Sequence, residues 1–186
     1  MARIYISSTF SDLEDYRREV SLAIRRLGHE DVAMEYYVAE DKRPLDRCLA
    51  DVTSSDVYVG IFAWRYGYIP KVGNPDQLSI TELEYRRALE MGKACLIFLI
   101  SETAPWPPVK MELAKIDRIN ALREEFINNE RHMVNKFNNA DELTRKVTEA
   151  VIKWEKDTGL AGKREPTDWY AFREAVSSRH RWVRLR

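Results

Sequence analysis

Five short runs rich in β-branched, aromatic and other apolar residues are spaced along the chain, and a segment with helical periodicity follows each of them. The third and fourth runs are apolar throughout, which is typical of strands covered on both faces. The predicted strands are Arg3–Ser7, Val32–Tyr37, Val57–Phe62, Ala94–Ile100 and His132–Phe137.

The helices that follow these strands carry recognisable start signals. A serine followed three residues later by a glutamate is a capping box, and this pair occurs at Ser11 with Glu14 and at Ser79 with Glu82. The predicted helices are Ser11–Leu27, Leu45–Val52, Ser79–Met91, Val109–Asn129 and Asp141–Trp154.

This alternation predicts an α/β fold: an open, mostly parallel five-stranded sheet with helices on both faces, in which the first strand lies at or beside the centre. Ligands of such sheets bind beyond the carboxyl ends of the strands, where the strand order reverses. Three segments are expected at that edge: the turn after Ser7, the loop Trp64–Leu78 and the start of the helix at Ser79.

Composition narrows the classes of partner. The 30 basic residues balance the 30 acidic ones, so no overall field draws the chain to nucleic acid or to an anionic membrane. No charged leader and no membrane-spanning apolar run is visible, and we expect a cytoplasmic protein. Cys48 and Cys95 lie in apolar or helical contexts and are expected to be reduced core thiols.

Several chemistries lack their sequence signature. The first turn, Ser7-Ser8-Thr9-Phe10-Ser11-Asp12, is neither a dinucleotide-binding fingerprint nor a P-loop. The three histidines show no metal-ligand spacing, and no serine or cysteine stands in a triad context. We therefore expect no metal and no bound cofactor.

Glu84 is the candidate catalytic residue. At about 100° per residue it projects into the apolar stripe of its helix, where a carboxylate is costly unless something pairs with it. The alternative is a simple ion pair with Arg87, three residues on. Glu82 falls on the opposite side, where its capping role explains it. The stripe consists of Ile80, Leu83, Ala88 and Met91.

Other residues near the same edge are candidates for substrate binding. Ser7 and Ser8 end the first strand, and Arg65 is either a phosphate ligand or simply an exposed arginine. Phe10, Trp64 and Tyr66 are suited either to stacking on a base or to packing the loop against the sheet. Packing is the expectation for Tyr68.

The run Ile4-Tyr5-Ile6-Ser7-Ser8-Thr9-Phe10-Ser11-Asp12 resembles the opening of the TIR-like (Toll/interleukin-1 receptor-like) superfamily. It is most similar to a bacterial and eukaryotic branch of unknown function, whose first strand ends in the same Ile-Ser-Ser-Thr-Phe run. The likeness spans roughly residues 3–100 and extends more loosely to about 157. It continues in Met34-Glu35-Tyr36-Tyr37, Ser55-Asp56-Val57-Tyr58-Val59-Gly60-Ile61, Arg65-Tyr66-Gly67 and Ser79-Ile80-Thr81-Glu82-Leu83-Glu84-Tyr85.

In TIR domains that cleave NAD, the essential glutamate lies on the helix after the third strand, four residues before a small residue. Glu84 before Ala88 matches that placement. The chain departs from the pattern in having Ile80-Thr81 where a Trp-Cys pair often stands, and Ser8 and Thr9 where aromatic and basic residues are common.

The resemblance implies an effector domain that cleaves NAD or a related nucleotide when neighbouring copies assemble, in immune or antiphage defence. NAD is then a substrate. The loops Val38–Arg43 and Trp64–Leu78 are long enough to carry contacts between copies. Two alternatives stay open: a non-catalytic TIR-like module for self-association or adaptor signalling, and a nucleoside deoxyribosyltransferase-like enzyme.

The domain organisation expected is a TIR-like effector at residues 1–157, followed by a linker and an amphipathic segment at 158–186. Trp169, Tyr170, Phe172 and Val176 recur there at helical spacing. The segment resembles the stretch that joins effector domains to the NTPase core of STAND-type sensors, so a downstream NTPase domain is expected. Folding of the segment back onto the first domain is the alternative.

Overall fold

The computed structural model describes residues 1–33, 45–132 and 134–160. These residues form a five-stranded sheet with strand order β2-β1-β3-β4-β5, and every neighbouring pair is parallel. The strands are β1 (Arg3–Ser7), β2 (Glu30–Val32), β3 (Val57–Phe62), β4 (Ala94–Ile100) and β5 (Val134–Phe137). The α-helices are α1 (Phe10–Arg26), α2 (Leu45–Ser54), α3 (Ile80–Glu90), α4 (Ile116–Asn128) and α5 (Ala140–Asp157).

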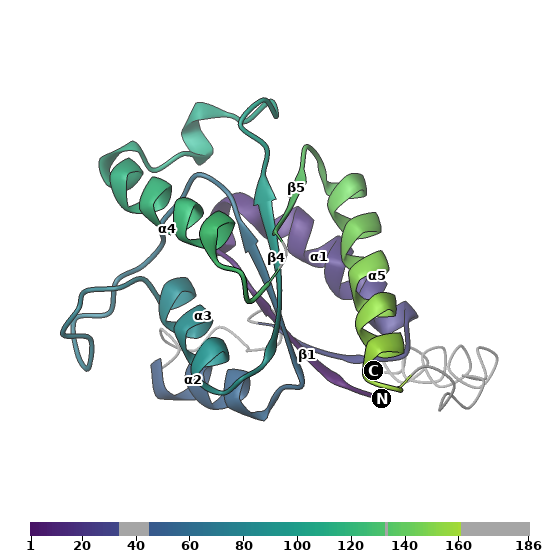
Figure 1. Ribbon diagram of the computed structural model, residues 1–186. Coiled ribbons are helices and arrows are strands. Elements are labelled where there is room, and N and C mark those ends of the chain that lie inside the picture. The colour runs from purple at the N-terminus through teal and green to yellow at the C-terminus, as the bar shows by residue number, and fades with distance from the viewer. Residues whose placement is uncertain (34–44, 133, 161–186) are drawn as a thin grey trace, which may run out of the picture.

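Helices cover both faces of the sheet (Figure 1): α1 and α5 lie on one side and α2, α3 and α4 on the other. Alternation along β1 supplies both cores, because successive side chains of a strand point to opposite faces. Ile4 and Ile6 pack with α1 and α5, whereas Tyr5 packs on the side of α3.

The predicted fold class is confirmed as an open parallel α/β sheet with helices on both faces, and its strand order is that of flavodoxin-like sheets. β1 lies beside the central strand β3, as expected. From β1 the chain passes outward to β2 and then crosses back to β3, so the strand order reverses between β1 and β3. The carboxyl ends of these two strands therefore frame the crevice in which such sheets bind ligands.

Two predicted helix starts differ from those in the structure. α1 begins at Phe10 rather than at Ser11, and its N-cap residue Thr9 makes no side-chain capping bond. α4 begins at Ile116 rather than near Val109, because the preceding residues form two short 3-10 turns, Pro108–Lys110 and Leu113–Lys115. Side chains from this segment bind other parts of the chain: Lys110 donates to the Asp12 carbonyl in the first turn of α1, and Glu112 accepts two backbone N–H groups of the loop after β3.

The second strand also differs from its prediction, since β2 begins at Glu30 and ends at Val32. Ala33, which was predicted to be in the strand, is outside it, and residues 34–37 of the predicted strand lie outside the described residues. The loop Val38–Arg43 and the amphipathic segment beyond residue 160 also lie outside the described residues.

Cys48 and Cys95 are buried free thiols, as predicted. Burial raises the pKa of Cys95 to about 12, so this thiol is a poor nucleophile near neutral pH. Among the described helices, none combines the length and apolar character needed to cross a membrane.

Candidate active site

Glu84 lies in α3 with only 2% of its surface exposed, and two hydroxyl groups bind its carboxylate. The Tyr5 hydroxyl donates to Oε1 at 2.6 Å, and the Ser7 hydroxyl donates to Oε2 at 2.6 Å. Both donors belong to β1, where alternation places residues two apart on the same face. A buried carboxylate is tolerated when hydrogen bonds replace its lost hydration, and these two bonds serve that purpose.

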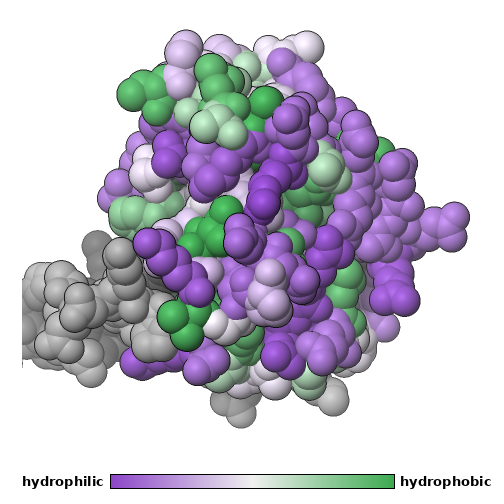
Figure 2. All heavy atoms as spheres, turned by 90° about the vertical axis from the view of Figure 1, so that its left-hand side faces the viewer, coloured by the Kyte–Doolittle hydropathy of each residue, from purple (hydrophilic) through white to green (hydrophobic). Residues whose placement is uncertain are grey.

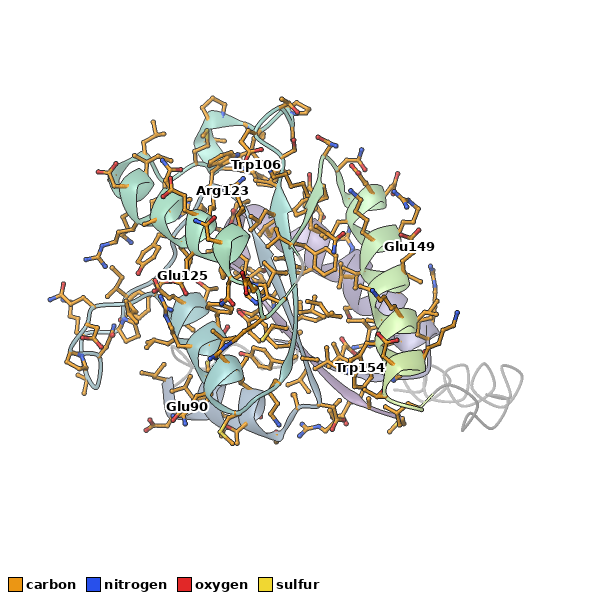
Figure 3. The ribbon with its side chains drawn as sticks, in the orientation of Figure 1. Glu90, Trp106, Arg123, Glu125, Glu149 and Trp154 are labelled. Carbon is orange, nitrogen blue, oxygen red and sulfur yellow. The ribbon has the colours of Figure 1, made fainter. Side chains whose placement is uncertain are left out.

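The ion pair with Arg87 considered from the sequence does not form. Arg87 instead pairs with Glu90 at 3.0 Å, and Glu90 lies towards the far end of α3 (Figure 3). The carboxylate of Glu84 therefore points to the sheet and not to the outer surface of the helix.

Contacts made by the first two turns of α3 hold this helix in place. The Ser79 hydroxyl accepts the backbone N–H of Glu82 at 3.3 Å, so this predicted cap is present. The Glu82 side chain binds elsewhere: it accepts the Tyr66 hydroxyl at 2.6 Å and Arg86 at 2.9 Å. Arg86 also binds Glu125 of α4 at 2.6 Å (Figure 3). Glu82 thus fastens the loop after β3 and the neighbouring helix to α3.

A cavity of about 450 Å³ opens beside Glu84 at the carboxyl edge of the sheet. The turn after β1, the loop after β3, the start of α3 and the segment before α4 all contribute to it. Its lining consists of Ser8, Thr9, Phe10, Ser11, Arg65, Gly67, Tyr68, Ile80, Thr81, Glu84, Glu112 and Lys115.

Gly67 lets the loop after β3 pass close to the turn after β1. Its φ of +93° lies in a region that residues with a side chain rarely adopt, and an added Cβ would lie 3.0 Å from the Thr9 methyl carbon. Glu112 fixes this loop by accepting the N–H groups of Tyr66 at 3.0 Å and Gly67 at 3.1 Å.

The charged groups of Glu112 and Lys115 bind other atoms of the cavity wall. Lys115 pairs with Glu112 at 2.8 Å and donates to the Gly67 carbonyl at 2.9 Å. Partial burial acts to raise the pKa of Glu112, but Lys115 and the backbone N–H groups outweigh it and hold this pKa below its usual range. Glu112 is therefore an anion that shapes the loop.

Arg65 is differently placed, because within the described part of the chain it forms neither an ion pair nor a hydrogen bond. The half-buried Arg65 lines the cavity together with Phe10 and Ser11. Five N–H donors on a planar group suit a phosphate or carboxylate of a ligand.

Ser8 lines the cavity and is also bound by the buried side chain of Arg17. The buried guanidinium of Arg17 donates to the Ser8 hydroxyl at 2.7 Å and to its carbonyl at 3.3 Å. The Ser8 hydroxyl in turn donates to the Thr9 carbonyl at 2.9 Å. Ser8 therefore shapes the turn as well as the cavity surface.

The predicted aromatic residues separate into two groups. Phe10 lines the cavity and is 45% exposed, and Tyr68, for which packing was expected, also lines it at 50% exposure. Trp64 and Tyr66 are absent from the lining. The Trp64 ring lies 4.3 Å from the Arg123 guanidinium, and Tyr66 is buried with its hydroxyl on Glu82.

The structure thus brings Glu84, Ser8, Phe10 and Arg65 to one cavity, with Ser7 directly behind the carboxylate. Tyr5 was missed, although the period of two along β1 carried the signal, because it places Tyr5 on the face of Ser7. No sequence pattern marked Glu112 and Lys115 as cavity residues, because the segment that contains them was predicted to be part of a helix and not a loop at the sheet edge. A buried carboxylate can stabilise positive charge that develops on a bound ligand, whereas a guanidinium suits an anionic group and exposed rings suit a base.

Comparisons with known proteins place this site in a family context. The family model described as "Domain of unknown function (DUF4062)" matches residues 3–152. Telomerase protein component 1 of Mus musculus and that of Rattus norvegicus are 30% and 29% identical over 118 aligned positions, and each match covers 49% of this chain. The chain spans only 4% of the length of these curated relatives.

Solved structures with a related arrangement include the CMP N-glycosidase BcmB of Clostridium botulinum, at 12% identity and a TM-score of 0.47, covering 80% of this chain and 98% of that one. The RPS4 and RRS1 TIR domain heterodimer matches at 14% identity and a TM-score of 0.49, covering 81% of this chain and 95% of that one. A prokaryotic SEFIR domain matches at 13% identity and a TM-score of 0.40, covering 69% of this chain and 100% of that one.

The family match extends from β1 almost to the end of α5 and so includes every residue that lines the cavity. The chain belongs to the DUF4062 family.

Proposed function

We propose that this domain hydrolyses the N-glycosidic bond of NAD or a related nucleotide, with Glu84 as the catalytic carboxylate. The observation that carries the proposal is the position of Glu84. It is a buried carboxylate held by two hydroxyl groups, and it lines a cavity at the point where the strand order reverses.

One carboxylate suffices for this reaction. The bond between ribose C1′ and the nicotinamide nitrogen breaks, and its electron pair neutralises the cationic ring, which leaves without needing a proton. Ordinary glycosidases need a second carboxyl group as an acid at this step. Glu84 stabilises the oxocarbenium-like transition state by its charge. Water then adds to C1′ and releases a proton, giving ADP-ribose and nicotinamide.

The other residues of the cavity suit the rest of the substrate. Phe10 and Tyr68 line the cavity and are 45% and 50% exposed, so their rings are available for a base to stack on. Arg65 supplies a cation for the diphosphate.

The direct test is to incubate concentrated protein with NAD and to separate nicotinamide and ADP-ribose by chromatography. Parallel samples with CMP and with deoxynucleosides test other N-glycosidic bonds. Release of nicotinamide is the expected result. Base exchange on deoxynucleosides instead would favour a deoxyribosyltransferase-like enzyme, and the absence of product from all three would leave a non-catalytic signalling module.

Replacing Arg65 by alanine is expected to raise KM for NAD about tenfold while changing kcat little, because a charge-assisted bond to the diphosphate is lost. The same variant should cleave nicotinamide riboside, which lacks phosphate, as well as the wild type does. Steady-state kinetics on both substrates measure the difference. Arg145→Ala on the exposed face of α5 is the matched control, and equal losses on both substrates would contradict a phosphate-binding role.

Self-association is part of the proposal, and exposed apolar residues beside the cavity support it. The segment that supplies Glu112 and Lys115 also exposes Val109 at 86% and Leu113 at 65%. Figure 2 shows hydrophobic side chains gathered at the top of this face, over the connection between β4 and α4. Apolar side chains exposed this strongly beside a cavity are suited to contact with a neighbouring copy.

We therefore expect the activity per molecule to rise steeply with protein concentration. Leu113→Asp should shift this rise to at least about tenfold higher concentration, because a charge in the contact must be desolvated. Ile127→Asp, at the opposite end of α4 and 52% exposed, is the control. Activity assays and sedimentation at matched concentrations measure both effects. Full activity in a dilute monomeric sample would refute the requirement for assembly.

A further inference from the structure

The carboxylate of Glu84 is bound on both oxygens from a single strand. Tyr5 and Ser7 lie two residues apart on β1, and each donates a hydroxyl to a different oxygen of Glu84 at 2.6 Å. Neither residue lines the cavity, whereas Glu84 does. The two hydroxyl groups therefore stand behind the carboxylate, on the side away from a bound ligand.

We infer that Tyr5 and Ser7 are positioning residues that fix the plane of the Glu84 carboxylate and maintain its charge. This inference rests on the proposed function, since it assigns to these hydroxyl groups the preparation of Glu84 for the reaction. Neither residue touches the substrate, so neither is catalytic in its own right.

The geometry explains how this works. Two donors on different oxygens oppose rotation about the last side-chain bond of Glu84, so the carboxylate keeps one orientation before substrate arrives. Hydrogen bonds to the charged form of a carboxylate also favour that form over the protonated one. Without them, burial at 2% exposure would favour protonation and remove the charge that the reaction needs.

The surrounding aromatic residues hold the donors in turn. Tyr5 stacks on Tyr58 with ring centroids 6.3 Å apart, and Tyr58 contacts Tyr85 of α3 at 6.3 Å. Burial, and after it the charge of Glu84, raise the pKa of Tyr58 well above its ordinary value, so this neighbour stays neutral at any physiological pH. The Tyr5 ring, whose hydroxyl binds Glu84, is thus packed in a buried cluster of three tyrosines.

Tyr5→Phe keeps the ring and removes only the hydroxyl. The expected results are a fall in kcat of about tenfold and a shift of the acid limb of the pH–rate profile to higher pH by about one unit, because a carboxylate that loses a donor binds its proton more readily. Ser7→Ala should act in the same direction from the other oxygen. Tyr85→Phe is the matched control, because that buried hydroxyl accepts from Asn129 and does not bind Glu84.

A second readout separates this inference from the proposed function. Glutamate labelled with ¹³C at the carboxyl carbon reports the titration of Glu84 by NMR, and its signal is assigned by its loss in Glu84→Gln. A midpoint that rises in Tyr5→Phe and Ser7→Ala but not in Tyr85→Phe supports the inference, even if the protein cleaves no nucleotide. A midpoint unchanged in both variants overturns it, even if the protein is an active hydrolase.

Discussion

Replacing Glu84 by glutamine is expected to lower kcat for NAD cleavage by about a thousandfold or more while leaving the fold intact. Glutamine keeps the size and shape of the side chain but removes the negative charge that stabilises the developing cation at C1′. Its amide can still meet the hydroxyl groups of Tyr5 and Ser7, so the packing of α3 on β1 persists. Nicotinamide release under saturating NAD measures the loss.

Glu90→Gln is the control for this variant. Glu90 lies on the same helix, with 65% of its side chain exposed and paired with Arg87, and it does not line the cavity. Its substitution should leave turnover unchanged, and circular dichroism should give the same helix content for both variants. Undiminished turnover in Glu84→Gln would remove Glu84 from the reaction.

Replacing Arg17 by methionine is expected to lower the free energy of unfolding by about 3 kcal/mol. Arg17 is 1% exposed, and its guanidinium holds the hydroxyl and the carbonyl of Ser8 in the turn after β1. Methionine fills a similar volume but leaves these buried acceptors without their donor. Urea denaturation followed by tryptophan fluorescence measures the change.

The matched control for this prediction is Arg18→Met, the next residue of α1. The Arg18 side chain is 61% exposed and pairs with Asp15 on the surface, where screening by water leaves little net stabilisation. A much smaller effect is therefore expected. Equal losses in the two variants would mean that the Arg17 bonds to Ser8 contribute no more than an exposed ion pair.

The sequence by itself predicted the sheet well, because burial on both faces requires uninterrupted apolar runs. β3 and β4 have the predicted bounds, and their place inside the sheet is the reason that their sequences are apolar throughout. Where a strand is short and lies at the edge, the pattern is weaker, and β2 accordingly begins and ends elsewhere than predicted.

The sequence also identified Glu84, because a carboxylate within the apolar stripe of a helix must find polar partners in the interior. Which partners it finds was open. An ion pair with Arg87 and a position at a ligand-binding edge both satisfied the pattern, and only the crossing of α3 over β1 decided between them. That crossing depends on residues more than 70 positions apart.

Tertiary structure alone decided which loop residues reach the cavity. Trp64, Arg65, Tyr66 and Tyr68 are neighbours in sequence with no regular period, so nothing in their order says which side chains point inward. The Arg123 guanidinium of α4 lies over the Trp64 ring, and Glu82 of α3 accepts a hydrogen bond from the Tyr66 hydroxyl. Periodic hydrophobicity thus determines the helices and strands and their buried faces. In irregular segments, the orientation of each side chain depends on contacts with residues distant in sequence, which form only when the chain folds.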